Sequence, residues 1–315
     1  MKKLLILFLI VSVTAVWSQT LEKKDSVQLW KTGGFTSLNF NQVQLSNWAK
    51  GGESSISATG LINLFANYIH KDMTWDNSCD FGYGVLKTED QSMRKNEDKI
   101  DLNSKFGYKA IPKFYYAALL NFKSQFDFGY NYPNDSVVIS KFFSPAYLVA
   151  SVGMDWKPSD VFSLYLSPFT GRFIFVGDQK IADAGAFTGM PAKYDAFNNV
   201  IEHGATFRPE FGALLNAKFK KDVFKNINFE SKVQLFNNYT DKIKENRANI
   251  NVDWENNILM KINSFVSANI FLHFLYDHYT KIPLYEKING VKTKVGDGPR
   301  LQLKEVLGIG FNYKF

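Results

Sequence analysis

The chain has 315 residues, of which 16% are aromatic, and its mean hydropathy is -0.19, so it is rich in rings but mildly polar on average. Its formal charge is +7, and the sequence contains no basic run that would indicate nucleic-acid binding. Its single cysteine excludes an internal disulfide and a cysteine-built metal site. Many rings with average polarity are unusual in a soluble enzyme. They are typical of a membrane β-barrel, in which a lipid-facing apolar band surrounds a polar lumen.

The amino-terminal segment has the pattern of a secretory signal. Lys2 and Lys3 precede an apolar run over residues 4–16, and small residues follow near a cleavage position. This pattern predicts a signal peptide over residues 1–18 and a periplasmic tail over residues 19–30. The alternative is a short amino-terminal membrane helix, but the run is shorter than the about 20 residues that a spanning helix needs.

From the tail onward, apolar and polar residues alternate with a period of two, which is the periodicity of strands. The predicted strands cover residues 31–45, 56–69, 73–85, 100–110, 114–130, 146–156, 161–176, 205–219, 227–239, 248–261, 265–279 and 301–315. Pro168 and Gly171 interrupt the seventh strand, and because proline removes a ladder donor, we expect a bulge or a kink there.

The connections between these strands alternate between long and short. An even number of strands with this alternation predicts an all-β fold over residues 31–315, a transmembrane antiparallel up-and-down β-barrel of about twelve strands with short periplasmic turns and long outer loops. The longest irregular stretch, residues 177–204, is predicted to fold over or into the mouth of the barrel. A soluble β-sandwich or β-propeller is the alternative, although no blade-length repeat is found.

One loop carries a family resemblance. The segment FNQVQLSNWAKGGESSISATG, residues 40–60, resembles an uncharacterised family of Bacteroidetes-type outer-membrane barrels, a domain of unknown function. The matching loop positions are Asn47, Trp48, Gly51 and Gly52. The resemblance implies a barrel in the outer membrane of a Gram-negative bacterium and implies no activity. From the residues alone, the glycines permit a tight loop and Trp48 suits the membrane interface, with a ligand contact as the alternative.

The carboxy-terminal strand has an apolar residue at every second position and ends on an aromatic residue. These positions are Leu307, Ile309, Phe311, Tyr313 and Phe315. The pattern resembles the closing strand of outer-membrane barrels, whose last residues are read as an insertion signal. Outer-membrane lipid and the outer-membrane insertion machinery are therefore expected partners.

Charged residues recur on the polar side of the predicted strands, where they would line a lumen. The predicted lumen-lining residues are Asp76, Asp80, Asp101, Lys105, Lys109, Lys123, Asp127, Arg208, Glu210, Lys218, Glu230, Lys232, Asp253, Glu255 and Lys304. Either they neutralise one another in a largely closed lumen, or they line a water-filled path that admits small polar solutes. A barrel of twelve strands lies between small packed barrels and wide porins, so strand number does not decide between them.

The histidines do not form a recognisable catalytic motif. His273 and Asp277 lie about 13 Å apart along an extended strand, which is too far for a dyad. We therefore predict no enzyme, no cofactor and no metal site, and a passive channel for small polar solutes. Two alternatives stay open: a non-conducting scaffold that binds another envelope protein, and a hydrolase at the extracellular rim built from His203, His278 and Asp277.

Overall fold

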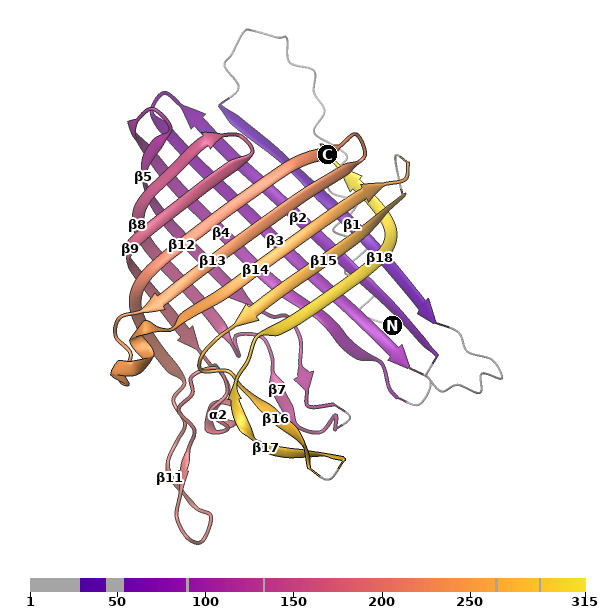
Figure 1. Ribbon diagram of the computed structural model, residues 1–315, viewed down its shortest axis with the longest axis vertical. Coiled ribbons are helices and arrows are strands. Elements are labelled where there is room, and N and C mark those ends of the chain that lie inside the picture. The colour runs from indigo at the N-terminus through magenta and orange to yellow at the C-terminus, as the bar shows by residue number, and fades with distance from the viewer. Residues whose placement is uncertain (1–28, 44–53, 89–90, 133, 264–265, 289) are drawn as a thin grey trace, which may run out of the picture.

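The computed structural model describes residues 29–43, 54–88, 91–132, 134–263, 266–288 and 290–315, and its main feature is a closed antiparallel barrel of twelve strands (Figure 1). In chain order the barrel strands are β1 (Trp30–Val43), β2 (Ser55–His70), β3 (Met73–Thr88), β4 (Arg94–Ile111), β5 (Phe114–Ser124), β8 (Ala146–Ser159), β9 (Phe162–Phe175), β12 (Phe207–Phe224), β13 (Ile227–Asn238), β14 (Ile250–Lys261), β15 (Val266–Tyr276) and β18 (Gln302–Lys314). Each strand pairs with its neighbour along the chain, and β18 closes the barrel by pairing with β1.

The alternation in the sequence becomes the two faces of the wall. On β18, Leu307, Phe311 and Tyr313 point outward and are each more than 60% exposed, whereas Gly308 and Gly310 face the lumen. Large apolar side chains are exposed in the same way on the outer face of the other strands, as a lipid-facing surface requires. The predicted fold class, a transmembrane antiparallel up-and-down barrel of about twelve strands, is confirmed.

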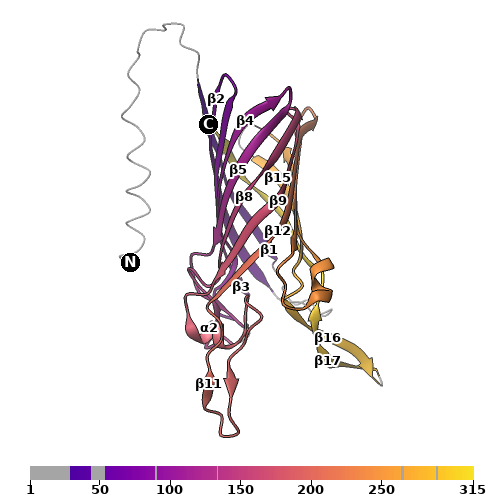
Figure 2. The same cartoon turned by 90° about the vertical axis from the view of Figure 1, so that its left-hand side faces the viewer.

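The two ends of the barrel differ. Short turns join β2 to β3, β4 to β5, β8 to β9, β12 to β13 and β14 to β15, and Phe315 lies beside Gly34 at this short-turn end. The long connections lie at the opposite end (Figures 1 and 2). They contain β6 (Gly129–Tyr130), β7 (Val138–Ser140), α2 (Gln179–Asp183), β10 (Lys193–Tyr194), β11 (Val200–Glu202), the 3-10 helix η1 (Lys244–Ala248), β16 (Lys281–Ile288) and β17 (Val291–Pro299).

Three strand boundaries differ from the prediction by five or more residues. β5 ends at Ser124 rather than at Tyr130, because the chain leaves the wall and Gly129–Tyr130 pairs with β7 in a small loop sheet. β4 begins at Arg94 rather than at residue 100, so part of the predicted connection between the third and fourth strands belongs to the wall. β12 continues to Phe224, which shortens the predicted connection over residues 220–226.

The predicted irregularity in the seventh strand is a β-bulge at Pro168. On β12, Ala213 is opposed by two residues of β9, Pro168 and Phe169, and the register also shifts where β9 meets β8. The extra residue reverses the alternation along β9. Tyr165 therefore faces the lumen before the bulge, and Arg172 faces it after the bulge.

The barrel is flattened rather than circular. It is wide in Figure 1 and narrow in the view turned by 90° in Figure 2. A circular barrel of twelve strands spaced ~4.8 Å apart and tilted ~40° has a diameter of about 24 Å. A Lys and a Glu in contact, both extended, join Cα atoms only about 14 Å apart. Contacts between opposite walls, described below, therefore require the flattened section.

Several predicted features lie outside the described residues. These are the signal peptide over residues 1–18, most of the tail over residues 19–30, and the loop positions Asn47, Trp48, Gly51 and Gly52. Among the residues that the structure does describe, no helix has both the length and the apolar character needed to cross a membrane.

Candidate functional site

The centre of the lumen is crossed by ion pairs between opposite walls, which we call the brace. Lys99 of β4 lies 2.7 Å from Glu255 of β14, and five strands separate β4 from β14 in either direction around the barrel. Lys123 of β5 lies 2.9 Å from Asp253 of β14. Lys232 of β13 lies 3.6 Å from Asp80 on the opposite strand β3. The brace therefore holds the two broad walls together across the lumen.

Strand register aligns the brace. Residues 218, 232, 255, 273 and 304 form one continuous row across β12, β13, β14, β15 and β18, and four of these five positions carry Lys or His. On the facing wall, Asp80, Asp101 and Lys123 are register partners across β3, β4 and β5. A mainly basic row thus faces a mainly acidic one, which favours the closed approach of the walls.

Water still reaches the brace. The side chains of its two shortest pairs, Lys99–Glu255 and Lys123–Asp253, are between 17% and 29% exposed. Partly hydrated charges keep much of their solvation, so they avoid the large cost of complete burial. The lumen at this level is therefore narrow, and its charged side chains are not fully buried.

A second charged group lies nearer the short-turn end. Lys157 bridges Asp76 at 2.7 Å and Asp155 at 3.5 Å, and Lys105 lies 2.7 Å from Asp155. On the other wall, Glu230 is surrounded by three lysines, Lys218, Lys220 and Lys232. These contacts give several of the predicted lumen charges a partner of opposite sign.

On one side of the brace the interior is filled by apolar side chains, and we call this region the packed lobe. Its buried cluster consists of Ala117, Leu119, Val149, Tyr165, Leu214 and Phe236, from β5, β8, β9, β12 and β13. Tyr165, Leu214 and Phe236 are at most 2% exposed. The hydroxyl of Tyr165 is hydrogen-bonded to Ser151 at 2.8 Å, so its polar end is satisfied. Solute cannot pass through this part of the section.

On the other side of the brace the interior is lined mostly by uncharged side chains, many of them small, and we call this region the open lobe. It is formed by the lumen faces of β1, β2, β15 and β18. Its lumen-facing residues include Ser37, Asn39, Ser57, Thr59, Asn63, Ser267, Asn269, Gly308, Gly310 and Asn312. Along β2 the lumen-facing residues are all partly exposed. The two lobes of one barrel thus differ in both filling and charge.

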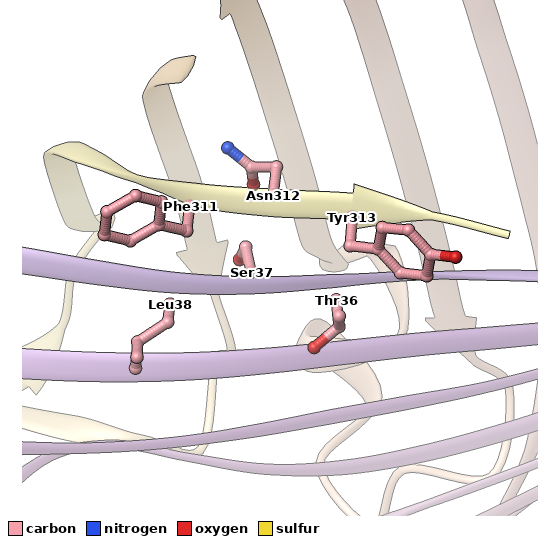
Figure 3. A pocket seen from close by; sticks show the side chains of 6 residues that line it. All are labelled: Thr36, Ser37, Leu38, Phe311, Asn312 and Tyr313. Atoms are coloured by element: carbon pink, nitrogen blue, oxygen red, sulfur yellow. The ribbon is translucent and has the colours of Figure 1, made fainter. Parts of the chain in front are cut away.

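The barrel is closed along a short seam beside the open lobe. The β1–β18 ladder pairs β1 only from Phe35 to Phe40, whereas the β1–β2 ladder runs along the whole of β1. A pocket of about 220 Å³ lies at this seam, and Figure 3 shows Leu38, Phe311 and Tyr313 among the residues that line it. Its lining is mostly the outer face of the wall.

At the long-loop end, two arginines share one buried carboxylate. Glu210 is 3% exposed and accepts hydrogen bonds from Arg172 and Arg208. The guanidinium of Arg172 lies 4.5 Å from the ring centre of Phe236, and that of Arg208 lies 3.8 Å from the ring centre of Tyr279. The cluster thus caps the packed lobe where β9 and β12 meet the loops.

The same cluster anchors the long loop over residues 177–204. Arg208 donates to the carbonyl oxygen of Thr188 at 2.6 Å, and Thr188 is 1% exposed. Tyr279 donates to Asp241 from another loop, and burial together with this hydrogen bond raises the pKa of Tyr279 to about 12. Residues 186–189 therefore lie against the barrel end, while the β10–β11 hairpin projects away from it (Figure 2).

His273 joins the brace instead of forming a dyad with Asp277. Its Nε2 lies 2.8 Å from Asp253, and Asp253, Glu255 and His273 offer ligand atoms within 4.8 Å of one another. That geometry could hold a cation, but Lys99 and Lys123 already contact the two carboxylates. The ammonium groups supply the positive charge that a metal ion would otherwise bring.

The residues of the hypothetical rim hydrolase contact other partners. His203 Nδ1 lies 3.1 Å from Asp183 within the same loop, and its side chain is 63% exposed. His278 donates its backbone N–H to Asn251, and Asp277 accepts the backbone N–H of Tyr279. These contacts give the hydrolase hypothesis no support.

Two predicted lumen residues lie elsewhere than expected. Because β5 ends early, Asp127 follows the wall strand and accepts a hydrogen bond from Tyr83, whose ring is on the outer face. Lys109 lies at the short-turn end, 3.8 Å from Asp72, with 42% of its side chain exposed. The closing residues of β18 point outward as predicted, and their role as an insertion signal stays a prediction.

Sequence reasoning missed several charged lumen residues, among them Lys99, Glu97 and Arg172. Lys99 and Glu97 lay outside the predicted strand over residues 100–110, although they continue the alternation of Asp101 toward the start of β4. That continuation was the signal that could have found them. Arg172 was missed because the bulge at Pro168 reverses the alternation before it. Lys304, which was predicted, pairs with Glu97 across the long-loop end of the open lobe.

Comparison with known families supports the recognised resemblance. Residues 40–130 match the model of a family described as "Protein of unknown function (DUF3078)", and this range includes the loop segment that carried the resemblance. A Bacteroidetes origin stays a prediction. A search of curated proteins by sequence found no match.

Solved structures of the same general shape are outer-membrane barrels. The COG4313 outer membrane channel from Pseudomonas putida F1 is 11% identical, with a TM-score of 0.40 over 94% of this chain and 100% of that chain. The NanC porin is 9% identical, with a TM-score of 0.36 over 88% and 98%. The translocator domain of the autotransporter NalP from Neisseria meningitidis is 9% identical, with a TM-score of 0.33 over 92% and 90%. Likenesses at this level carry no argument about activity.

Proposed function

We propose that the protein is an integral barrel of the Gram-negative outer membrane that lets small polar solutes pass passively through its lumen. The observation that carries the proposal is the brace, whose charges face the lumen and stay partly exposed. A lumen built only for rigidity would be expected to bury such pairs or to replace them with apolar packing, as in the packed lobe. The apolar outer face supports a position in the membrane.

The brace also predicts that the passage is narrow. Because Lys99 and Glu255 bring opposite walls into contact, the conductance of the wild-type protein should be small for a barrel of twelve strands. The first test is single-channel conductance of residues 19–315 refolded into a planar bilayer. Steady small steps support the proposal, and a folded barrel without steps contradicts it.

A variant of the brace makes this test sharper. Glu255→Gln leaves Lys99 without its partner across the lumen, so the walls are held less tightly and the conductance should rise about two- to five-fold. Asp297→Asn is a matched control, because it removes the same charge from a 2.9 Å lysine pair in the β17 hairpin outside the barrel. Exchange of the two charges, Lys99→Glu with Glu255→Lys, should restore the wild-type conductance.

A second candidate is a non-conducting barrel that binds another envelope protein. One observation favours it: the β10–β11 hairpin projects beyond the barrel and exposes Phe197 to 86% and Ile201 to 70%. Exposed apolar side chains at a loop tip suit a protein contact. In this case the barrel would be silent in the bilayer, and Phe197→Ser with Ile201→Ser would abolish co-purification of the partner.

A further inference from the structure

The two lobes of the lumen suggest which solutes can pass, and this step rests on the proposed function. Of the described lumen-facing residues of β1 and β2, Lys31 at the short-turn end is the one charged side chain. Across the seam, β18 contributes Gly308 and Gly310, and a Cβ at Gly308 would meet only the side chain of Asn39 at 3.3 Å. The β1–β2 wall of the open lobe is thus low in charge, and its side chains range in size from Gly33 and Ser37 to Phe35, Leu61 and Phe65.

The chemistry of this wall is that of amides and hydroxyls. Asn63 donates to Asp80, Asn39 donates to Ser37 and Asn312 donates to Ser267, so each of these amides already uses a donor. The side-chain oxygens of Asn39 and Asn269 are buried acceptors without a hydrogen-bond partner in the structure. On β2 the lumen-facing Ser57, Thr59 and Asn63 are partly exposed, so their hydroxyl and amide groups can exchange hydrogen bonds with a solute that carries the same groups.

The wall of the open lobe stabilises ions less than it stabilises neutral polar solutes. The lumen charges nearest to it are held by partners of opposite sign: Glu255 by Lys99, Asp253 by Lys123, and Glu97 by Lys304. An ion that enters the open lobe loses part of its hydration, and no unpaired charge of the brace compensates it. A neutral solute of the same size avoids this cost.

We propose that the solute path runs through the open lobe, between the brace and the β1–β18 seam, and that it favours uncharged polar solutes with several hydroxyl or amide groups. The packed lobe on the far side of the brace carries no flow. The Lys304–Glu97 pair lies at the long-loop entrance of the path, where a neutral solute can pass it without exchanging charge.

The test is osmotic swelling of liposomes that contain the full mature chain. Arabinose is the neutral probe, and gluconate and lysine are charged probes of similar size. We expect arabinose to enter at least about three times faster than either charged probe. Equal entry of the three probes would overturn the inference while leaving the proposed passage intact. Absence of entry for all three, together with absence of conductance steps, would overturn both.

A blocking variant tests where the path lies. Thr59 faces the lumen toward the long-loop end of β2, and the neighbouring Ala58 faces outward. Thr59→Trp should reduce arabinose entry about five-fold or more, whereas Ala58→Trp, which adds the same ring on the lipid face, should leave it unchanged. Unchanged entry in a folded Thr59→Trp barrel would overturn the inference.

A second variant covers the case in which Thr59→Trp does not fold. Thr59→Cys is folded into liposomes first and is then treated with a bulky water-soluble thiol reagent. Reaction should reduce arabinose entry, and the wild-type protein treated in the same way controls for Cys79, whose strand position faces outward. A labelled Thr59→Cys barrel with normal entry would again place the path outside the open lobe.

Discussion

The packed lobe and the open lobe are built from neighbouring strands of one barrel with the same type of alternation, yet a buried apolar cluster fills only the packed lobe. In the packed lobe, Leu214 and Phe236 fill the lumen side of β12 and β13 as the core of a soluble protein would. In the open lobe, many of the lumen-facing positions carry Gly, Ser, Thr or Asn, with Phe35, Leu61 and Phe65 among the exceptions. The number of strands sets the perimeter of a barrel, but the size of the inward side chains decides how much of the section stays free.

The brace lies between the two lobes and connects these properties. Because Lys99–Glu255 and Lys123–Asp253 pull the broad walls together, the flattened section can be filled completely on one side by side chains of ordinary size. The side chains of the packed lobe then prevent the two walls from approaching further. The cross-section of the lumen in the open lobe is therefore less completely filled. Filling on one side and clearance on the other are therefore parts of one arrangement.

The largest expected effect comes from emptying the packed lobe. Phe236→Ala removes a side chain that is 2% exposed and also removes the ring under Arg172, so unfolding should become easier by about 3–5 kcal/mol. Phe65→Ala in the open lobe is the matched control, and it should cost less because Phe65 is only half-buried. Urea unfolding in lipid vesicles, followed by tryptophan fluorescence, measures both. Equal losses would mean that the lobes do not differ in packing.

A smaller effect tests the backbone of the packed lobe. Gly153 of β8 lies beside the bulge of β9, and a Cβ there would stand 2.2 Å from the carbonyl oxygen of Leu166. Gly153→Ala should therefore lower the free energy of unfolding by about 1–3 kcal/mol. At Gly60 in β2 the nearest atom would be 3.9 Å away, so Gly60→Ala should be neutral or slightly stabilising. The same unfolding measurement compares the two variants. Similar losses of unfolding free energy for Gly153→Ala and Gly60→Ala would contradict the close approach of the backbone at the bulge.

The wall of the barrel could be predicted from the sequence because its signal is local. Alternation along each strand and turn residues between strands gave the twelve strands and the long and short ends, and Pro168 gave the bulge. The boundary of β5 could not be predicted, because the alternation continues past Ser124 although Gly129–Tyr130 pairs with β7 instead of the wall.

The division of the lumen was beyond local reasoning. The alternation of apolar and polar residues predicted that Asp80, Lys232 and Glu255 face inward. The residue that each of them contacts depends on the flattened cross-section of the barrel and on the register of strands far apart in the chain. The predicted polar lumen also missed the apolar cluster around Leu214, because inward apolar residues look like interruptions of the polar face. The sequence analysis therefore left a closed network and an open path as alternatives, and the structure contains both a network of paired lumen charges and a stretch of wall with few charges.

The smallest expected effect concerns the loop that covers the packed lobe. Asp178 caps α2 by accepting from the backbone N–H groups of Lys180 and Ile181, and it lies 2.6 Å from Lys141. The hydrogen bond from Lys141 and those of the cap hold the pKa of Asp178 below its usual value. Because the pKa is depressed in the folded state, this carboxylate stabilises the loop above the usual Asp pKa, and the contribution is lost as pH falls through the folded value, below about pH 4.

Hydrogen exchange of residues 177–190 measures this loss. We expect exchange corrected for its intrinsic pH dependence to accelerate between pH 6 and pH 3, by about five-fold or less because the side chain of Asp178 is 25% exposed. Asp178→Asn should show the fast exchange already at pH 6. Glu202→Gln, which breaks the exposed 2.5 Å pair with Lys193 farther along the same loop, should leave α2 unaffected. If it accelerates exchange as much as Asp178→Asn, the loop responds as one unit. Its hold on the packed lobe would then rest on Arg208 and Thr188 at the barrel end rather than on the cap of α2.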